Sequence, residues 1–307
     1  MRKALNTVTI EGVLSEVDVN YGSYVKDGKT VECIRGTVTV LVNENINGEE
    51  VNCEIPVTVF SPKFKKDGGE NPSYSSIEKV KNEFTSIAAA GGINGADRVR
   101  ITGAQIRTNE YFGSNGQLIS YPRITASFIN KIKKDDCKPT AIFTCEMVVA
   151  QKNYKVDNEG VEVEPRTLCV KGILPQYGET VDVVDFVCSN DNVASVVDEY
   201  WEVNSTVKVQ GRLNFSSKIE TIKEELDFGD PVERKRTIST SELIITGGAK
   251  TPLEGEYAFD MEEIKDGLAK RKVKLENSKE KASKPREHKA PAPAGDITAS
   301  ATVDLGF

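Results

Sequence analysis

The residues best suited to chemistry are aromatic and basic side chains gathered on one predicted β-hairpin. Two alternating runs within residues 98–129 flank the turn Ser114-Asn115-Gly116-Gln117, and Asn-Gly favours the left-handed angles of a two-residue type I′ turn. Five side chains gather around this tip: Arg107, Tyr111, Phe112, Tyr121 and Arg123. Rings of this kind stack on nucleobases and cations of this kind neutralise phosphates. The alternative interpretation of each ring is an ordinary strand residue.

The first run of this hairpin changes phase beside a glycine. Val99 and Ile101 alternate with polar residues, and after Gly103 the alternation resumes one residue out of step at Ala104. A phase change next to a glycine predicts a β-bulge that curls the strand.

Further rings and cations fall in other predicted loops and on strand edges. In the first half of the chain they are Tyr21, Tyr24, Arg35, Lys63 and Lys65. In the second half they are Tyr154, Arg166, Lys208 and Arg212. We predict that the rings stack on bases and that the cations contact phosphates. The polar face that carries Lys208 and Arg212 is either the lining of a groove or an ordinary solvated face.

Several kinds of chemistry are disfavoured by what the sequence lacks. The single histidine, His288, lies in a Lys/Pro/Ala-rich tail, so no histidine serves catalysis or metal binding in the predicted folded part. Walker, GxSxG and HExxH motifs do not occur. We therefore expect a protein that is not an enzyme and that uses no metal ion or cofactor, although carboxylates alone can act as acid and base.

Cysteine usage and hydropathy indicate the compartment. The six cysteines form no CxxC pair and fall mostly in strand-like runs, which is typical of buried thiols in a reducing compartment. No signal peptide and no membrane-spanning apolar run is visible. We expect a cytoplasmic protein, or one of the host cytoplasm if the chain is viral.

The charge balance constrains where a polyanion could bind. The net charge is −7, and residues 250–307 carry 11 basic and 11 acidic residues, so the whole excess belongs to residues 1–249. A nucleic-acid site must then be a local basic groove on an acidic body. The competing interpretation is an acidic protein without a polyanionic partner.

The elements predicted to position these residues begin with three strands and a helix. The strands cover residues 6–19, broken at Gly12, then 33–42 and 51–60, with a loop at 20–31 that turns at Asp27-Gly28. Ser75 and Glu78 predict a capping box, followed by one helix that ends before Gly91. The hairpin at 98–129 follows.

The same order recurs in the second half, which predicts an internal duplication. Strands are expected at 142–150, 167–174 and 180–188, a helix from Asp191 capped by Asn190, then strands at 207–215 and 237–246 around a long loop. Asn20-Tyr21 and Asn153-Tyr154 hold similar places after the first strand of each half. Five strands with a helix between the third and fourth is the order of the OB-fold, a Greek-key barrel. We expect a mainly β chain with OB-folds at 1–136 and 137–249.

Residues 250–307 form a tail of different composition. An amphipathic helix is predicted within 257–275, with Phe259, Ile264 and Leu268 on one side. A Pro/Ala-rich flexible linker follows, and the expected disordered segment ends in Asp304, Leu305, Gly306 and Phe307. An apolar end after such a stretch suggests docking on a partner, and the alternative is a terminus that drifts freely.

In element order, loop chemistry and tail, the chain resembles single-stranded DNA-binding proteins, particularly the phage type with two OB-folds. The order and loops cover residues 1–249, and the C-terminal Asp304-Leu305-Gly306-Phe307 resembles the family's partner-binding tip. That tip usually has several adjacent acids and often a proline before the phenylalanine, whereas Gly306 stands there in this chain.

The resemblance implies a protein that coats and protects single-stranded DNA without sequence preference during replication, recombination or repair, with the tip recruiting partner proteins. Two alternatives remain at this point. One is a structural β-barrel protein, such as a virion component, that binds protein or glycan. The other is a binder of single-stranded RNA.

Overall fold

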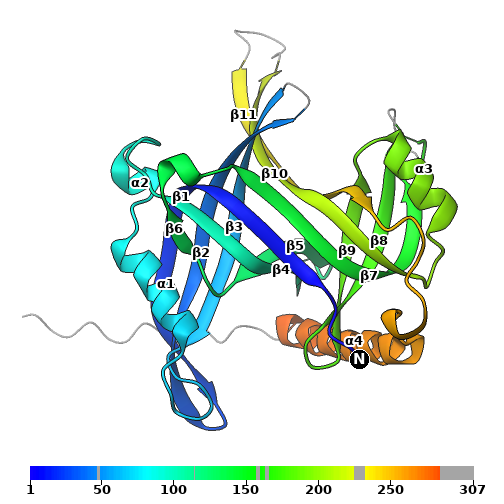
Figure 1. The fold of residues 1–307 in the computed structure, drawn as a ribbon, viewed down its shortest axis with the longest axis horizontal. Coiled ribbons are helices and arrows are strands. Elements are labelled where there is room, and N and C mark those ends of the chain that lie inside the picture. Colours follow the sequence, from blue (N-terminus) through cyan, green and yellow to red (C-terminus); the bar gives the residue numbers. More distant parts are fainter. Residues whose placement is uncertain (47–48, 114, 157–159, 163–165, 225–231, 284–307) are drawn as a thin grey trace, which may run out of the picture.

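The computed structural model describes residues 1–46, 49–113, 115–156, 160–162, 166–224 and 232–283. The described chain is mainly β (Figure 1). Its eleven strands belong to one hydrogen-bonded sheet that curls into two closed rings.

The first ring, here called barrel 1, is closed by five strands. They are β1 (Asn6–Lys26), β2 (Lys29–Ile46), β3 (Glu49–Pro62), β4 (Arg98–Phe112) and β5 (Leu118–Ala126). Neighbours pair in the order β1–β2–β3–β5–β4 and back to β1, with β3 and β5 parallel. A short strand, β6 (Asn130–Ile132), adds to the edge of β4.

Barrel 2 repeats this scheme in the second half of the chain. Its strands are β7 (Thr140–Tyr154), β8 (Leu168–Gln176), β9 (Thr180–Cys188), β10 (Thr206–Glu224) and β11 (Val232–Gly248). They pair in the order β7–β8–β9–β11–β10 and back to β7, with β9 and β11 parallel. The predicted repeat of strand and helix order is therefore confirmed.

The two barrels share their hydrogen bonding. Strand β1 pairs antiparallel with β7 from Asn6 opposite Cys145 to Glu11 opposite Thr140. Two separate β-domains were expected, but this ladder joins all the strands into a single sheet. One apolar core accordingly runs through both barrels, from Val8 and Ile10 of β1 to Phe143 and Cys145 of β7.

One helix follows the third strand of each barrel, as the sequence predicts, and packs on the core, although one cap differs. Helix α3 (Asp191–Tyr200) begins at Asn190, whose side chain accepts a hydrogen bond from the Val193 amide, as expected. Helix α1 (Pro72–Glu83) instead begins at Asn71, so the predicted Ser75 capping box is wrong. The predicted single helix is also broken, because the chain is extended at Phe84 before the short α2 (Ile87–Ala90).

Two predicted loops are ribbons of paired strands. Strands β1 and β2 pair out to Lys26 and Lys29, and the two residues between them, Asp27 and Gly28, have φ of 50° and 74°. This is the type I′ geometry that a two-residue hairpin favours. Strands β10 and β11 likewise pair out to Glu224 and Val232, where a loop had been expected. Strand β1 also runs through Gly12 without a break.

The bulge predicted at Gly103 is confirmed, and the predicted turn of the β4–β5 hairpin is not. The β1–β4 register shifts across Gly103, which has a φ of 74°. Beyond the pair Phe112 and Leu118, the Gly113 amide donates to the Gln117 carbonyl at 2.9 Å, so the loop is longer than a two-residue turn.

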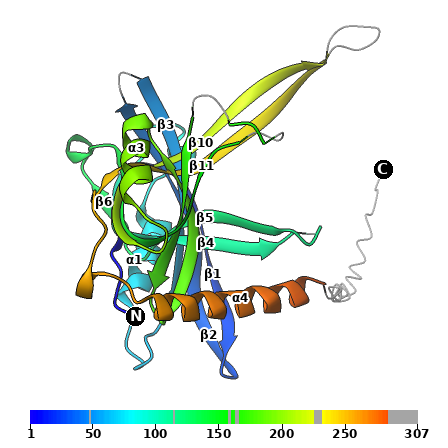
Figure 2. The same ribbon diagram turned by 90° about the vertical axis from the view of Figure 1, so that its right-hand side faces the viewer.

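Residues 250–283, expected to be part of a flexible tail, pack against the barrels. After a short 3₁₀ turn (Gly255–Tyr257), Phe259 and Ile264 bury themselves against Val148, Ile173 and Val181 of barrel 2. Helix α4 (Met261–Ser283) then runs below barrel 2 and beside the β4–β5 ribbon, in contact with β9 and β4 (Figures 1 and 2). Residues 284–307, with His288 and the tip residues Asp304, Leu305, Gly306 and Phe307, lie outside the described residues. Across the described residues, no helix is long and apolar enough to cross a membrane.

Candidate functional site

A groove of about 1040 Å³ crosses the outer face of barrel 1, here called the main groove. Its floor consists of cross-strand rows whose side chains point away from the core. One row joins Asn20 of β1, Arg35 of β2 and Phe60 of β3, which lie directly opposite one another in register. A parallel row runs through Thr37, Thr58 and Thr125. Because side chains alternate across a strand, these residues face solvent while their neighbours Ile34 and Val59 fill the core.

Three large aromatic side chains line the main groove and remain about half exposed. Phe60 is 49% exposed and Phe128 is 48% exposed, although neither has a polar atom that would favour contact with water. Tyr21, 51% exposed, lies at the rim, where its hydroxyl interacts with Glu78 and Asn82 of α1 and Lys81 lies over its ring. Phe60 and Phe128 therefore present purely apolar rings in the main groove, whereas the ring of Tyr21 already has a cation over it.

Two arginines enter the main groove without carboxylate partners. Among the described residues, neither Arg35 nor Arg123 forms an ion pair, and Asp18 is the only carboxylate among the groove's described lining residues. The Nε atom of Arg123 is buried and has no hydrogen-bond partner in the described part of the chain. Unpaired guanidinium groups beside exposed rings make the main groove attractive to an anion that also carries flat apolar faces.

Beyond Phe60 the surface continues into a lysine-rich patch at the end of the β1–β2 ribbon. The ring of Tyr24 lies 5.8 Å from that of Phe60, which links the two surfaces. The lining side chains of this lysine patch include Tyr24, Phe64, Lys26, Lys29, Lys65 and Lys66. Lys63, also predicted to contact phosphates, forms an ion pair instead. Its Nζ lies 2.6 Å from Glu32, a contact that raises the pKa of Lys63.

The β4–β5 ribbon carries three of the rings predicted to stack on bases, Tyr111, Phe112 and Tyr121. Tyr111 and Tyr121 meet edge to face at 6.3 Å and are 45% and 43% exposed. Phe112 is covered differently, because Lys279 of α4 lies 5.8 Å from its ring centre. These three residues belong to the β4–β5 ribbon, which projects beside α4 (Figure 2).

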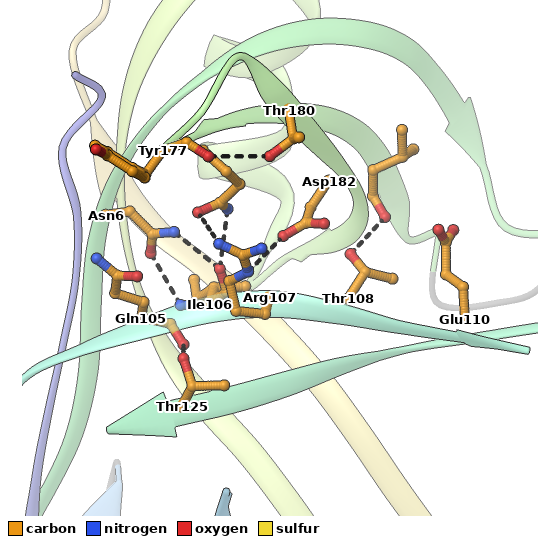
Figure 3. Close-up of polar contacts among 12 residues, drawn as sticks. Asn6, Gln105, Ile106, Arg107, Thr108, Glu110, Thr125, Tyr177, Thr180 and Asp182 are labelled. Carbon is orange, nitrogen blue, oxygen red and sulfur yellow. Dashed lines mark hydrogen bonds and ion pairs between the residues drawn. The ribbon is translucent and has the colours of Figure 1, made fainter. Parts of the chain in front are cut away.

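Arg107, at the base of this ribbon on β4, lies at the junction of the barrels. Its Nε is 3.0 Å from Oδ2 of Asp182, and one terminal nitrogen donates to Oε1 of Gln176 at 2.9 Å (Figure 3). The Thr108 hydroxyl donates to the Val183 carbonyl beside them. Burial raises the pKa of Asp182, and the charge of Arg107 opposes that rise. Arg107 thus holds β4 against barrel 2.

A family model described as YorF matches residues 4–281. The chain belongs to the YorF family. No curated protein sequence matches it.

Solved structures similar to this YorF-family chain include two of the single-stranded DNA-binding protein from Thermus aquaticus. The wild-type structure is 13% identical with a TM-score of 0.47, over 83% of this chain and 96% of that one. A deletion mutant is 12% identical with the same score, over 85% and 100%. A Replication Protein A heterotrimer bound to single-stranded DNA is 8% identical with a TM-score of 0.22, over 90% and 70%.

Two of the candidate residues of barrel 2, Tyr154 and Arg166, are engaged with each other in this YorF-family structure. The guanidinium of Arg166 lies over the ring of Tyr154 at 4.2 Å and forms an ion pair with Glu162 at 2.8 Å. Lys208 lies opposite Glu146 in the β10–β7 ladder. Arg212 lies on the same strand, β10; burial raises the pKa of the Cys53 thiol of β3, and the charge of Arg212 opposes that rise.

The bulges of the first strand in each barrel show that Tyr21 and Tyr154 are not equivalent. The register shift falls between Leu14 and Glu16 in β1 and between Val149 and Gln151 in β7. Counted from the second residue of each pair, Tyr21 comes five positions later and Tyr154 only three. The predicted echo of Asn20-Tyr21 in Asn153-Tyr154 is therefore displaced by two residues.

Two residues that line the main groove, Phe60 and Phe128, were not predicted from the sequence. Phe60 ends the run Val57-Thr58-Val59-Phe60, in which the valines are buried, so strict alternation would have placed its ring outside. Phe128 follows β5 and gives no local signal of this kind. No cluster of three or more His, Cys, Asp or Glu side chains that could hold a metal ion occurs within the described ranges.

Proposed function

We propose that this protein binds single-stranded DNA without sequence preference in the main groove of barrel 1. The observation that carries the proposal is the pair of half-exposed rings, Phe60 and Phe128, in one groove with Arg35 and Arg123, two arginines without carboxylate partners. Stacking of a base on an aromatic ring contributes about 1–3 kcal/mol and tolerates every base, because every base has a π-face. The arginines would neutralise the phosphates that connect the stacked bases.

The same chemistry favours an unpaired strand over a duplex. In a duplex the base faces are already stacked on one another and are not available to Phe60 and Phe128. An unpaired strand can turn its bases onto the rings and its phosphates towards the cations.

We infer that the strand continues from the main groove onto the lysine patch. Tyr24 and Phe64 would extend the row of rings, and Lys65 with its neighbours Lys26 and Lys29 would meet further phosphates. Tyr111 and Tyr121, further along the β4–β5 ribbon from Arg123, would stack on bases beyond the main groove. Contacts of nucleic acid with Phe112, Tyr154, Arg166, Lys208 and Arg212 stay predictions, and so does the contact of Lys63, which is paired with Glu32.

We also propose that each barrel is an OB-fold, with domains at residues 1–136 and 137–249 and a tail at 250–307. The support is the cyclic strand order, in which the third strand pairs in parallel with the fifth in both halves. The same proposal includes a role in replication, recombination or repair, a phage origin and a cytoplasmic location. It also includes the absence of enzymatic activity and the recruitment of partner proteins by residues 304–307. They rest on the resemblance of the sequence and tail.

The test is a titration of a fluorescent oligo-dT and of a matched duplex over a range of salt. We expect tight binding of oligo-dT at low salt, a falling affinity with rising salt, and much weaker binding of the duplex. Phe60→Ala should weaken binding by about 1–3 kcal/mol, roughly 5- to 150-fold. The matched control is Tyr177→Ala, which removes a fully exposed ring outside the main groove.

Three outcomes would count against the proposal. Micromolar or weaker binding at low salt, or a flat salt dependence, would favour a structural protein that ignores nucleic acid. Equal binding of duplex and oligo-dT would exclude stacking on the groove rings as the basis of recognition. Stronger binding of an RNA of the same length would reassign the substrate, since stacking alone does not distinguish the sugars.

A further inference from the structure

A second cavity, of about 270 Å³, lies where the β4–β5 ribbon, strand β9 and helix α4 meet, and we call it the junction cavity. Its charged lining is mostly basic. The cations are Arg107, Arg123, Lys270, Arg271 and Lys274, and the carboxylates are Glu110 and Asp182. This excess of positive charge contrasts with the net charge of −7 of the whole chain.

Three of these cations already have partners. Arg107 pairs with Asp182, and Arg271 donates two hydrogen bonds to the carboxylate of Glu110. Lys270 pairs with Glu179 at 2.7 Å, outside the lining of the junction cavity. Within the part of the chain that the structure describes, Arg123 and Lys274 remain without an ion pair.

Arg123 is placed in a way that calls for an anion. It lies directly opposite Arg107 in the β4–β5 ladder, and like charges in that relation repel each other. Asp182 and Gln176 contact Arg107, whereas the buried Nε of Arg123 has no hydrogen-bond partner among the residues that the structure describes. A buried donor without an acceptor is unfavourable, and an anion at this point would both accept from Arg123 and reduce the repulsion.

Arg123 also lines the main groove, so the two cavities share it. Lys274 reaches the junction cavity from the other side because α4 packs closely on barrel 2. Gly267 makes that approach possible, since a Cβ at this position would lie 2.7 Å from a methyl group of Val181. Leu268 continues the packing onto the same apolar cluster.

We propose that the junction cavity binds a phosphate group, held by Arg123 and Lys274, and that this phosphate belongs to the strand leaving the main groove. The inference rests on the proposed function, because it extends the path of the same strand. It assigns α4, outside both barrels, a direct part in holding nucleic acid.

The experiment compares Lys274→Gln with Lys272→Gln in the full-length chain. Both variants remove one positive charge from α4, and Lys272 does not line the junction cavity. Each is titrated with oligo-dT of about 20 nucleotides over a range of salt, a length chosen to exceed the roughly 4–16 nucleotides that one OB-fold covers. Thermal melting of both variants monitors folding.

We expect Lys274→Gln to weaken binding of the long oligonucleotide about fivefold at 0.1 M salt and to lower the slope of log affinity against log salt by about 0.7, the contribution of one phosphate contact on a single strand. Lys272→Gln should match the unaltered protein. The loss caused by Lys274→Gln should shrink for an oligonucleotide of about 6 nucleotides, which the main groove alone can hold.

Distinct results would overturn the inference. If the unaltered protein binds oligo-dT and the two variants behave alike, the junction cavity is not on the strand's path. If inorganic phosphate raises the melting temperature of the unaltered protein but not of Lys274→Gln, while both bind the long oligonucleotide equally, the junction cavity holds a free anion only. If the unaltered protein binds no oligonucleotide, the proposed function itself fails.

Discussion

The carboxylate of Glu11 receives two hydrogen bonds from Arg100, from Nε at 2.7 Å and from a terminal nitrogen at 3.2 Å. The two residues lie directly opposite each other in the β1–β4 ladder. The Lys138 amide, in the link between the barrels, donates to the same carboxylate at 2.6 Å. Glu11 therefore ties together two strands of barrel 1 and the segment that leads to barrel 2.

We predict that Glu11→Gln lowers the free energy of unfolding by about 2 kcal/mol, since it weakens several hydrogen bonds to a buried charge. Denaturant unfolding measures this change. Glu16→Gln, on the same strand but exposed, is the control and should change the stability by less than about 0.5 kcal/mol.

Glu11 also predicts how stability depends on pH. The hydrogen bond from Arg100 is the largest cause that holds the pKa of Glu11 below its usual value. The contribution of ionised Glu11 to the free energy of unfolding is therefore fully present above the pKa that Glu11 has in the unfolded chain. It is lost as the pH falls through the lower pKa that Glu11 has in the folded protein. Unfolding measured between pH 7 and pH 3 should show a smaller acid-induced loss for Glu11→Gln than for the unaltered protein. An identical pH dependence would contradict this role.

Arg107 and Asp182 should behave as a coupled pair at the barrel junction. Arg107→Gln leaves a mostly buried carboxylate without its cation, so we expect a loss of about 1–3 kcal/mol. Arg107→Gln with Asp182→Asn should recover part of that loss, because the unpaired charge is then gone. A double-mutant cycle in denaturant unfolding measures the coupling, and additive effects would show that the ion pair is not energetically significant.

Strand β1 can pass β2 at Gly12 only because this residue lacks a side chain. A Cβ at Gly12 would lie 2.3 Å from the Leu41 carbonyl oxygen, a backbone atom that cannot rotate away. We expect Gly12→Ala to cost about 2–4 kcal/mol. Gly92→Ala is the matched control, since nothing lies within 4 Å of a Cβ there. Similar melting temperatures for the two variants would contradict the packing described for β1.

Arg35 should contribute charge without sequence preference. We predict that Arg35→Gln lowers the salt slope of oligo-dT binding by about 0.7 and weakens binding of dT and mixed-sequence oligonucleotides alike. Lys133→Gln removes an exposed charge elsewhere and should leave binding unchanged. A loss restricted to one base composition would indicate base reading by Arg35 instead.

The element order could be predicted from the sequence because strand alternation and helix caps are local signals. Asn190 stands directly before an apolar-periodic run, and it is the N-cap. The predicted start of the first helix is wrong because Ser75 and Glu78 have the spacing of a capping box but lie one turn inside the helix. Asn71 and Pro72 mark its true start. A local pattern cannot separate two such candidates when both satisfy it.

The site was predicted less completely, because its features depend on contacts distant in sequence. The sequence gives no sign that Arg107 forms an ion pair, because its partner Asp182 lies 75 positions later in the chain. The two residues meet only when the barrels pack together. The position of Tyr154 depends on a bulge that the sequence does not mark. Phe128 joins the main groove only through the closure of barrel 1.

The ladder between β1 and β7 has a consequence for any attempt to study the halves apart. From Asn6 to Glu11, one side of β1 bonds to β7 while the other side is occupied by β4. A fragment that stops at the linker would carry a row of bare amides and carbonyls along β1, and its counterpart would carry the matching row along β7. Such edges recruit other chains. Isolated halves should therefore dimerise or precipitate, and co-expressed halves should reassemble.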